Sequence, residues 1–119
     1  MVIAGVNDLL FASKIRSAAA AAKAEVRFAS TGEALLEAVR TLSPGLVLLD
    51  LNDRRIDPVG LLARLRSDPA LSSLKVIGFV SHVQGELIAA ARQAGIDEVL
   101  ARSAFVARLP ELLSAGLNP

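Results

Sequence analysis

The chain has 119 residues, no cysteine and a formal net charge of +1. This length indicates one domain, and the absence of cysteine excludes a disulfide framework and a thiolate metal site. No run of Lys or Arg, no basic secretion-signal segment and no apolar stretch of the roughly 20 residues that a spanning helix needs is present. We therefore expect a cytoplasmic protein that binds neither nucleic acid nor a membrane.

Short apolar runs alternate with amphipathic stretches along the whole chain. In order, the sequence predicts strand 2–6, helix 9–22, strand 25–28, helix 32–42, strand 46–50, helix 58–66, strand 76–80, helix 84–94, strand 98–101 and helix 104–115. Strands that alternate with helices and are apolar along most of their length favour a parallel sheet covered on both faces. The predicted fold class is α/β, with one domain over residues 1–119 and no effector domain.

Several of the helix boundaries have a local physical cause. Ser30 or Thr31 is expected to cap the helix that follows, and Asp57 is expected to cap a helix that starts with Pro58. Gly95 is expected to end the helix before it. Only four residues are aromatic, so we expect an aliphatic core. The second helix is expected to contribute to it a buried face at helical spacing, Leu35, Leu36, Val39 and Leu42.

Polar side chains follow four of the five predicted strands. They are Asn7 and Asp8, then Asp50 with Asn52 and Asp53, then Ser81 and His82, and finally Arg102 and Ser103. Ligands of open α/β sheets bind beyond the carboxyl ends of the strands, so we expect these side chains to meet in one crevice. Asp50 ends the apolar run LVLLD and is therefore expected to point into this crevice and not into the core.

The predicted crevice has the groups that a divalent cation and a phosphoryl group require. Two close carboxylates repel unless a cation lies between them. Asp8, Asp50 and the main-chain carbonyl of Asn52 could supply ligands for Mg²⁺, which prefers oxygen. Arg102 could neutralise the opposite side or pair directly with Asp50. A carboxylate beside Mg²⁺ and a guanidinium is equipped to accept a phosphoryl group.

Three stretches resemble the receiver domains of two-component response regulators. STGEALLEAVRTLSPGLVLLDLN is similar to the second helix, the loop and the third strand of that family. LLARLRSDPALSSLKVIGF resembles the part from the third helix to the fourth strand, and AARQAGIDEVLARSAF resembles the end of the fourth helix and the fifth strand. The resemblance implies a flavodoxin-like fold, a doubly wound five-stranded parallel sheet in the order 2-1-3-4-5.

The resemblance also implies roles for single residues. Asp50 matches the phosphoacceptor, Asn52 the residue that lends a carbonyl to the metal, and Arg102 the basic residue after the fifth strand. Other positions depart from the family pattern. Where the family has an acidic pair after the first strand, this chain has one acid, Asp8, and where the family has a hydroxyl residue it has Val80, with Ser81 next to it. Two prolines of the family are replaced by Arg54 and Ser103, and an aromatic residue is replaced by Val99. These departures are typical of a degenerate, pseudo-receiver-like active site.

Each candidate residue also has a purely structural interpretation. Asp50 could be a cap or form a static salt bridge to Arg102, and Asp8 could cap the first helix. His82 could be solvated, or could donate a hydrogen bond to Asp50 or to a phosphoryl group and so partly replace the missing hydroxyl. Arg54 could belong to an exposed basic patch with its neighbour, or could fold over the crevice and occupy the phosphate site.

Two functional hypotheses follow. In the first, the chain is a stand-alone receiver whose Asp50 takes a phosphoryl group from a partner histidine kinase with Mg²⁺, with output through contacts with a downstream protein. In the second, it is a pseudo-receiver, a protein-interaction module that is independent of phosphorylation. An enzyme of the same fold is disfavoured, because no glycine-rich phosphate loop follows the first strand and no nucleophile–base arrangement is evident. The sequence permits a homodimer through the last helices without demanding one.

Overall fold

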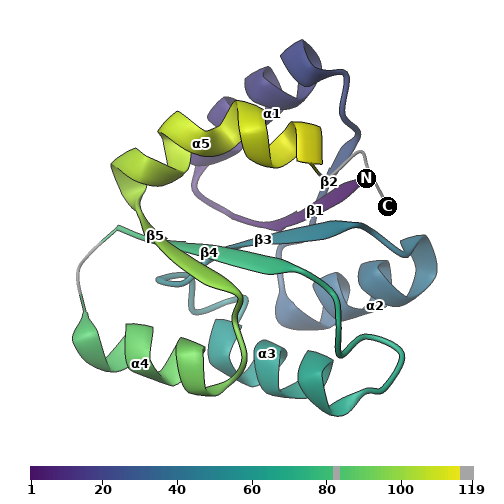
Figure 1. Ribbon diagram of the computed structural model, residues 1–119, viewed down its shortest axis with the longest axis vertical. Coiled ribbons are helices and arrows are strands. Elements are labelled where there is room, and N and C mark those ends of the chain that lie inside the picture. Colours follow the sequence, from purple (N-terminus) through teal and green to yellow (C-terminus); the bar gives the residue numbers. More distant parts are fainter. Residues whose placement is uncertain (82–83, 116–119) are drawn as a thin grey trace.

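All five predicted strands pair in parallel, in the order β2-β1-β3-β4-β5 (Figure 1). The computed structural model describes residues 1–81 and 84–115. Its elements are β1 (Val2–Gly5), α1 (Leu9–Ala22), β2 (Val26–Phe28), α2 (Gly32–Leu42), β3 (Leu46–Asp50), α3 (Pro58–Ser67), β4 (Val76–Val80), α4 (Gly85–Gln93), β5 (Glu98–Ala101) and α5 (Arg102–Ala115). The predicted fold class and the strand order implied by the family resemblance are both confirmed.

Most element boundaries lie within one residue of the predicted ones. The exception is α5, which begins at Arg102 directly after β5, two residues before the predicted start. Arg102 and Ser103 therefore belong to the first turn of a helix and not to a loop. No helix in the described ranges has both the length and the apolar character needed to span a bilayer.

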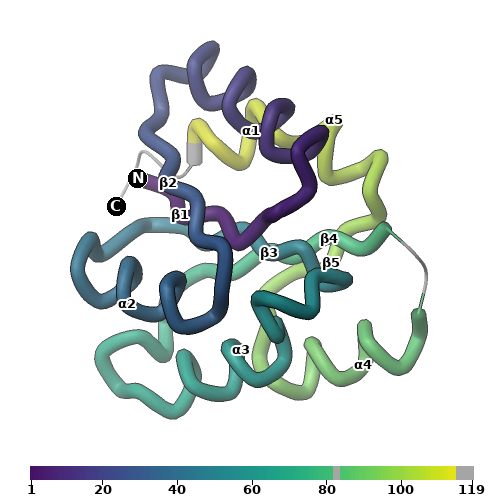
Figure 2. Tube along the Cα trace, turned by 180° about the vertical axis from the view of Figure 1, so that it is seen from behind, coloured from purple at the N-terminus to yellow at the C-terminus, as the bar shows by residue number. Residues whose placement is uncertain are grey.

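The helices form two layers, with α1 and α5 on one face of the sheet and α2, α3 and α4 on the other (Figures 1 and 2). The core under α2, α3 and α4 is aliphatic, as expected. The core under α1 and α5 is built around three phenylalanines, which composition alone did not predict. Phe79 stacks between Phe11 and Phe105, with ring centroids 4.7 and 4.3 Å apart. These rings fasten α1, β4 and α5 together.

The predicted caps are partly confirmed. Thr31, rather than Ser30, caps α2 by accepting a hydrogen bond of 3.1 Å from the main-chain N–H of Ala34. Asp57 precedes α3 as predicted, but its side chain makes no capping hydrogen bond, and its backbone is left-handed with φ of 50°. The start of α3 is therefore stabilised by Pro58 at the first helical position, because proline has no N–H that needs a capping partner.

The predicted buried face of α2 is correct except at its end. Leu35, Leu36 and Val39 are at most 1% exposed, whereas Leu42 is 38% exposed. Leu42 is the last residue of the helix, and the chain leaves the helical path at Ser43 in a left-handed conformation. The helical periodicity predicted burial of Leu42 as if the helix continued for another turn, whereas the helix ends at this residue.

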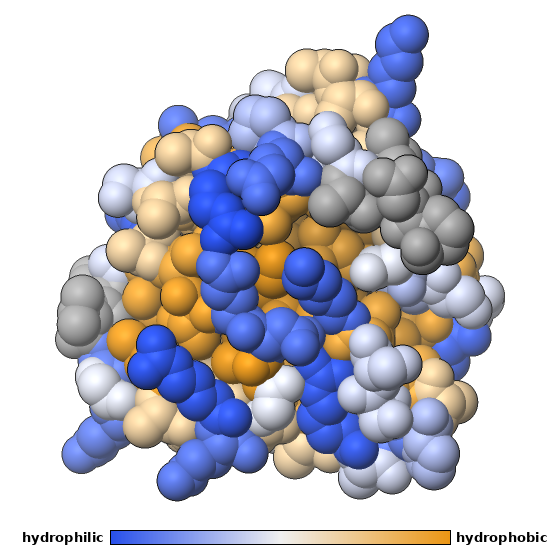
Figure 3. All heavy atoms as spheres, viewed as in Figure 1, coloured by the Kyte–Doolittle hydropathy of each residue, from blue (hydrophilic) through white to orange (hydrophobic). Residues whose placement is uncertain are grey.

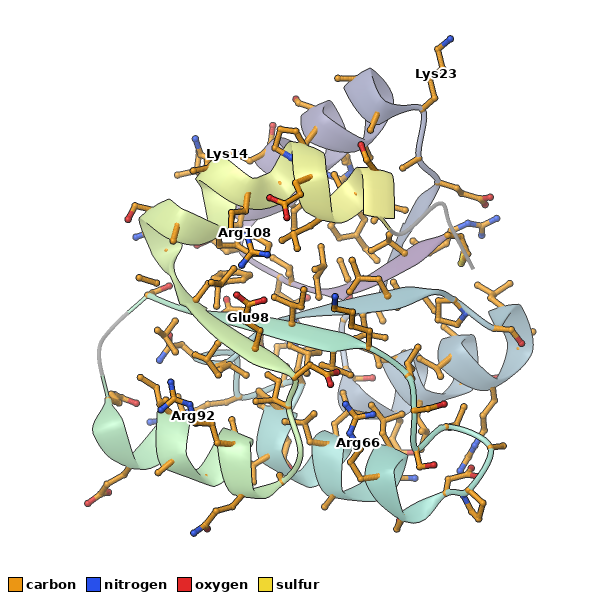
Figure 4. The ribbon with its side chains drawn as sticks, viewed as in Figure 1. Lys14, Lys23, Arg66, Arg92, Glu98 and Arg108 are labelled. Atoms are coloured by element: carbon orange, nitrogen blue, oxygen red, sulfur yellow. The ribbon has the colours of Figure 1, made fainter. Side chains whose placement is uncertain are left out.

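Arg66 joins three segments at the end of the sheet opposite the strands' carboxyl termini (Figure 4). Its side chain is only 18% exposed and forms an ion pair of 3.0 Å with Asp97. It also donates hydrogen bonds to three main-chain carbonyls, those of Ser72, Leu74 and Gly95. Asp97 in turn accepts a hydrogen bond of 2.7 Å from the N–H of Val76. The planar guanidinium thus holds the connections that lead into β4 and β5.

We predict that Arg66→Lys lowers the free energy of unfolding by about 2 kcal/mol, because an ammonium group cannot reach all of these acceptors. Arg64→Lys is the matched control, since Arg64 lies on the same helix in an exposed ion pair with Glu33, and it should change stability by less than about 0.5 kcal/mol. Urea denaturation measures both changes. Equal effects of the two substitutions would contradict this structural role of Arg66.

Candidate functional site

Asp50 is the one buried polar residue in the part of the chain that the structure describes, with 8% exposure. It ends β3, where all five residues are buried. Its Oδ1 accepts a hydrogen bond of 3.0 Å from the N–H of Asn52, and its carbonyl accepts one of 3.1 Å from the N–H of Asp53. Its Oδ2 has no hydrogen-bond or ion-pair partner within residues 1–81 and 84–115. One oxygen of the carboxylate is therefore fixed and the other is available.

Two asparagines connect the loops around Asp50. The Nδ2 group of Asn7, after β1, donates to the carbonyl of Ser30 at 2.9 Å and to Oδ2 of Asp53 at 2.7 Å. Asn52, after β3, accepts a hydrogen bond of 2.7 Å at its Oδ1 from the N–H of Ser81. These bonds link the segments that follow β1, β2, β3 and β4, as the crevice hypothesis requires.

The surroundings of Asp50 disfavour its negative charge. Burial raises the pKa of Asp50 most, the hydrogen bond from the N–H of Asn52 opposes this rise, and the charges of Asp53 and Asp8 raise the pKa further. Arg102 lowers this pKa and is the weakest of the causes. Within the described ranges, none of the three acids forms an ion pair with a side chain. The negative charge of these acids is therefore offset only in part, by Arg102.

Arg102 lies near the site but does not form an ion pair with Asp50. Its Cζ is 4.6 Å from the centroid of the Phe11 ring, a cation–π arrangement. The interpretation of Asp50 as half of a static salt bridge with Arg102 is therefore wrong for this conformation. Asp8 does cap α1, since its Oδ1 accepts a hydrogen bond of 3.1 Å from the N–H of Phe11. Its role as a metal ligand remains a prediction.

The remaining candidates have mixed outcomes. Ser81 lies beside the site, where its N–H bonds to Asn52. His82 lies outside the described residues, so its predicted role stays a prediction. Arg54 and Arg55 are both exposed, as an exposed basic patch requires. Arg54 lines an open cavity of about 530 Å³ together with Leu51, Asn52, Asp53, Asp57, Pro58, Val59, Gln84 and Leu87. It does not pair with an acid there.

Comparison with known proteins identifies the fold and the family. The family profile described as the response regulator receiver domain matches residues 7–114. The chain belongs to this family. Receiver domains are signalling domains that interact with histidine kinases and output proteins, and they are not conventional enzymes. A search of curated proteins finds no match.

Solved structures of receiver domains superpose on nearly the whole chain. A response regulator of red-light signalling from R. palustris is 26% identical, with a TM-score of 0.77 and coverage of 96% of this chain and 88% of that one. The phosphorylated cyanobacterial phytochrome response regulator RcpA is 22% identical, with a TM-score of 0.76 and coverage of 98% and 93%. The Mn²⁺-bound form of the response regulator Rcp1 is 15% identical, with a TM-score of 0.76 and coverage of 96% and 88%.

The donors at the site fit a small hard cation. Asp50, a buried residue, offers a carboxylate oxygen that lacks a partner in the described ranges, and Asp8 and Asp53 add negative charge nearby. No group of three or more His, Cys, Asp or Glu side chains within residues 1–81 and 84–115 is arranged to bind a metal. Mg²⁺ needs no such group, since it takes one or two carboxylates and completes its shell with carbonyls and water.

Sequence analysis missed the part that Asp53 plays. It placed Asp53 in the crevice but gave it no role, whereas this residue bonds to Asn7 and raises the pKa of Asp50 more than Asp8 does. The two partners are separated by 46 positions. The available signal was the occurrence of an amide at the end of one strand and an acid just after the end of its neighbour in the sheet.

The raised pKa of Asp50 predicts that Asp50→Asn stabilises the protein at pH 7, because it removes a desolvated charge. The folded state holds this proton more tightly than the unfolded state. The free energy of unfolding of the wild type therefore falls as the pH rises above about 3.9, the ordinary aspartate value. Below that value the carboxyl is neutral in both states, and the advantage of Asn should vanish.

Urea denaturation of both proteins as a function of pH measures this difference. Asp57→Asn is the control, because Asp57 is an exposed acid of the same loop, and it should change stability by less than about 0.5 kcal/mol. A wild type that is more stable than Asp50→Asn at pH 7 would contradict this interpretation of the site.

Proposed function

We propose that this receiver domain accepts a phosphoryl group on Asp50 from the phosphohistidine of a partner histidine kinase, and that it signals through contacts with a downstream protein. The observation that carries the proposal is the state of Asp50: it is buried at the end of an apolar strand, yet one carboxylate oxygen has no partner in the described ranges. A purely structural aspartate at such a position, with the acids Asp53 and Asp8 beside it, would be expected to form an ion pair, and none is present within residues 1–81 and 84–115.

The transfer is a single displacement at phosphorus. Oδ2 of ionised Asp50 forms a bond to phosphorus while the bond from phosphorus to the imidazole nitrogen breaks, and that nitrogen keeps the electron pair. The product is an acyl phosphate on Asp50 and a neutral histidine on the partner. Mg²⁺, when held by Asp8, Asp50 and the carbonyl of Asn52, would neutralise charge that develops on the phosphoryl oxygens.

The cationic and hydroxyl groups of the site have proposed roles as well. Arg102 is exposed and lies on Phe11, so its guanidinium is free to move towards a phosphoryl group and form a charge-assisted hydrogen bond. Val80 cannot donate a hydrogen bond, and its side chain is buried. The Ser81 hydroxyl, which has no partner in the described ranges, is proposed to take this place. His82 is a further candidate donor.

An apolar surface beside the site supports docking of a partner kinase. Leu9 and Leu10, directly after Asp8, are 83% and 59% exposed. Leu10 also borders a shallow groove between α1 and α5, together with Ser13, Lys14, Ser17, Ala18, Val106, Leu109 and Pro110. Exposed leucines beside a groove between two helices are typical of a surface that packs against helices of another protein.

The output surface is proposed to be the face formed by α4, β5 and α5. Figure 3 shows apolar atoms between α4 and α5 with hydrophilic side chains crossing them. Val99 and Leu100 of the edge strand β5 are partly exposed there. Glu98 and Arg108 point towards one another across this face and form an ion pair (Figure 4). A downstream protein or a second copy of the chain could bind here.

The pseudo-receiver alternative is favoured by two observations. Arg102, the basic residue near Asp50, lies on the Phe11 ring and forms no ion pair with Asp50, and Val80 stands where the family resemblance implies a hydroxyl residue. In this alternative the chain binds its partner whether or not Asp50 can be phosphorylated.

Acetyl phosphate with Mg²⁺ tests the proposal. The intact mass of the wild type should increase by one phosphoryl group, and Asp50→Asn should remain unmodified because it has no acceptor oxygen. Asp57→Asn is the control for loss of an exposed acid on the same loop and should be modified like the wild type. An unmodified wild type, with partner binding that Asp50→Asn leaves intact, would instead establish the pseudo-receiver alternative.

Leu10→Glu tests the kinase-docking surface. We predict that it lowers the rate of transfer from a cognate phosphorylated kinase by about tenfold, because it introduces a charge into an apolar contact. Labelling by acetyl phosphate, which needs no docking, should be unchanged. Leu42→Glu, at an exposed leucine on α2, is the matched control. A variant Leu10→Glu that accepts phosphoryl groups from the kinase as fast as the wild type would exclude this surface.

A further inference from the structure

The loop after β1 contains an amide where the family resemblance implies a second acid. The Nδ2 group of this residue, Asn7, donates one hydrogen bond to the carbonyl of Ser30 and another to Oδ2 of Asp53. The second bond joins the end of β1 to the loop after β3, the strand that pairs with β1. This hydrogen bond holds the carboxylate of Asp53, which belongs to the loop after β3, at the end of β1.

Asp53 is held in place but keeps the capacity to bind a further ligand. Its Oδ2 accepts from Asn7 at 2.7 Å, and its Oδ1 accepts from the N–H of Arg55 at 2.9 Å. A carboxylate has about four lone-pair positions, so two hydrogen bonds leave about two of them free. Asp53 is half-buried and forms no ion pair with a side chain in the described part of the chain.

A turn after β3 places Asp53 beside Asp50. The main-chain N–H of Asp53 donates a hydrogen bond of 3.1 Å to the carbonyl of Asp50. Asp8 already uses one carboxylate oxygen to cap α1 and is exposed. Asp50 is more than nine-tenths buried, and its Oδ2 has no partner within residues 1–81 and 84–115. Two neighbouring carboxylates that have free lone pairs and form no ion pair in the described part of the chain favour binding of a divalent cation between them.

We infer that Asp53, oriented by Asn7, supplies the second carboxylate of the cation site, directly or through a metal-bound water, in place of the acid that the end of β1 lacks. The inference rests on the proposed function, because it concerns the cation used for phosphoryl transfer to Asp50. Asn7 is then a positioning residue that acts through Asp53. In this arrangement, Asp53 from the loop after β3 and Asn7 from the loop after β1 together take the place of a second acid after β1.

Isothermal titration calorimetry with Mg²⁺, and with Mn²⁺ as a second probe, tests this inference on the protein without any phosphodonor. Asp53→Asn should weaken cation binding by about tenfold or more. Asn7→Ala should weaken it severalfold, because Asp53 loses its orienting donor. The matched control Asp57→Asn removes an exposed acid of the same loop and should bind the cations as tightly as the wild type. Circular dichroism melting checks that each variant is folded.

A double variant separates metal binding from simple stability. The exchange Asn7→Asp with Asp53→Asn keeps an amide–carboxylate hydrogen bond between the two loops but moves the carboxylate to the end of β1. We predict that it recovers most of the affinity that Asp53→Asn loses. If Asp53→Asn alone binds Mg²⁺ and Mn²⁺ like the wild type, or if the wild type binds neither cation, the inference is wrong.

The labelling of Asp50 distinguishes this failure from failure of the proposed function. A wild type that acetyl phosphate modifies, together with Asp53→Asn that binds cations normally, retains the proposed function and overturns the role of Asp53. A wild type that binds Mg²⁺ through Asp53 but is never modified retains the role of Asp53 and overturns phosphoryl acceptance.

Discussion

A buried carboxylate without a counter-ion in the described part of the chain is the constraint on which this site depends. Asp50 ends the central strand of an apolar sheet, and Asp53 and Asp8 add like charge beside it. Such an arrangement destabilises the folded protein, since a desolvated charge is costly unless it is paired. We propose that the same arrangement prepares Asp50 to bind a cation and, through it, an incoming phosphoryl group. The residue proposed to accept the phosphoryl group therefore lowers the stability of the folded protein, as is common for functional sites.

The rest of the fold holds this carboxylate in place from two sides. Phe79 is the partner of Asp50 in the register of β3 and β4, and it stacks with rings from α1 and α5. Arg102 lies on one of these rings and so stays within reach of the site without neutralising it. On the other side, Asn7 and Asn52 tie together the loops that follow four strands. The aromatic layer and the hydrogen-bonded loops together position the carboxylate of Asp50.

Local patterns in the sequence were sufficient for the fold class and for the position of Asp50, and the family resemblance added the strand order. Apolar strands, helical periodicity and polar residues at strand ends are visible along the chain. The interactions that define the site's chemistry are not local. Asn7 and Asp53 meet only because β1 and β3 are neighbours in the sheet. Arg102 lies on Phe11 because α5 starts directly after β5 and packs against α1, which no single stretch of sequence reveals.

The most direct test of this view of the site is a measurement of the Asp50 carboxyl pKa by carbon-13 NMR, with and without Mg²⁺. We predict that the pKa lies above the ordinary aspartate range in the absence of the cation and falls clearly when Mg²⁺ is added, because the cation offsets the charges of Asp53 and Asp8. An Asp50 that titrates in the ordinary range and does not respond to Mg²⁺ would contradict it.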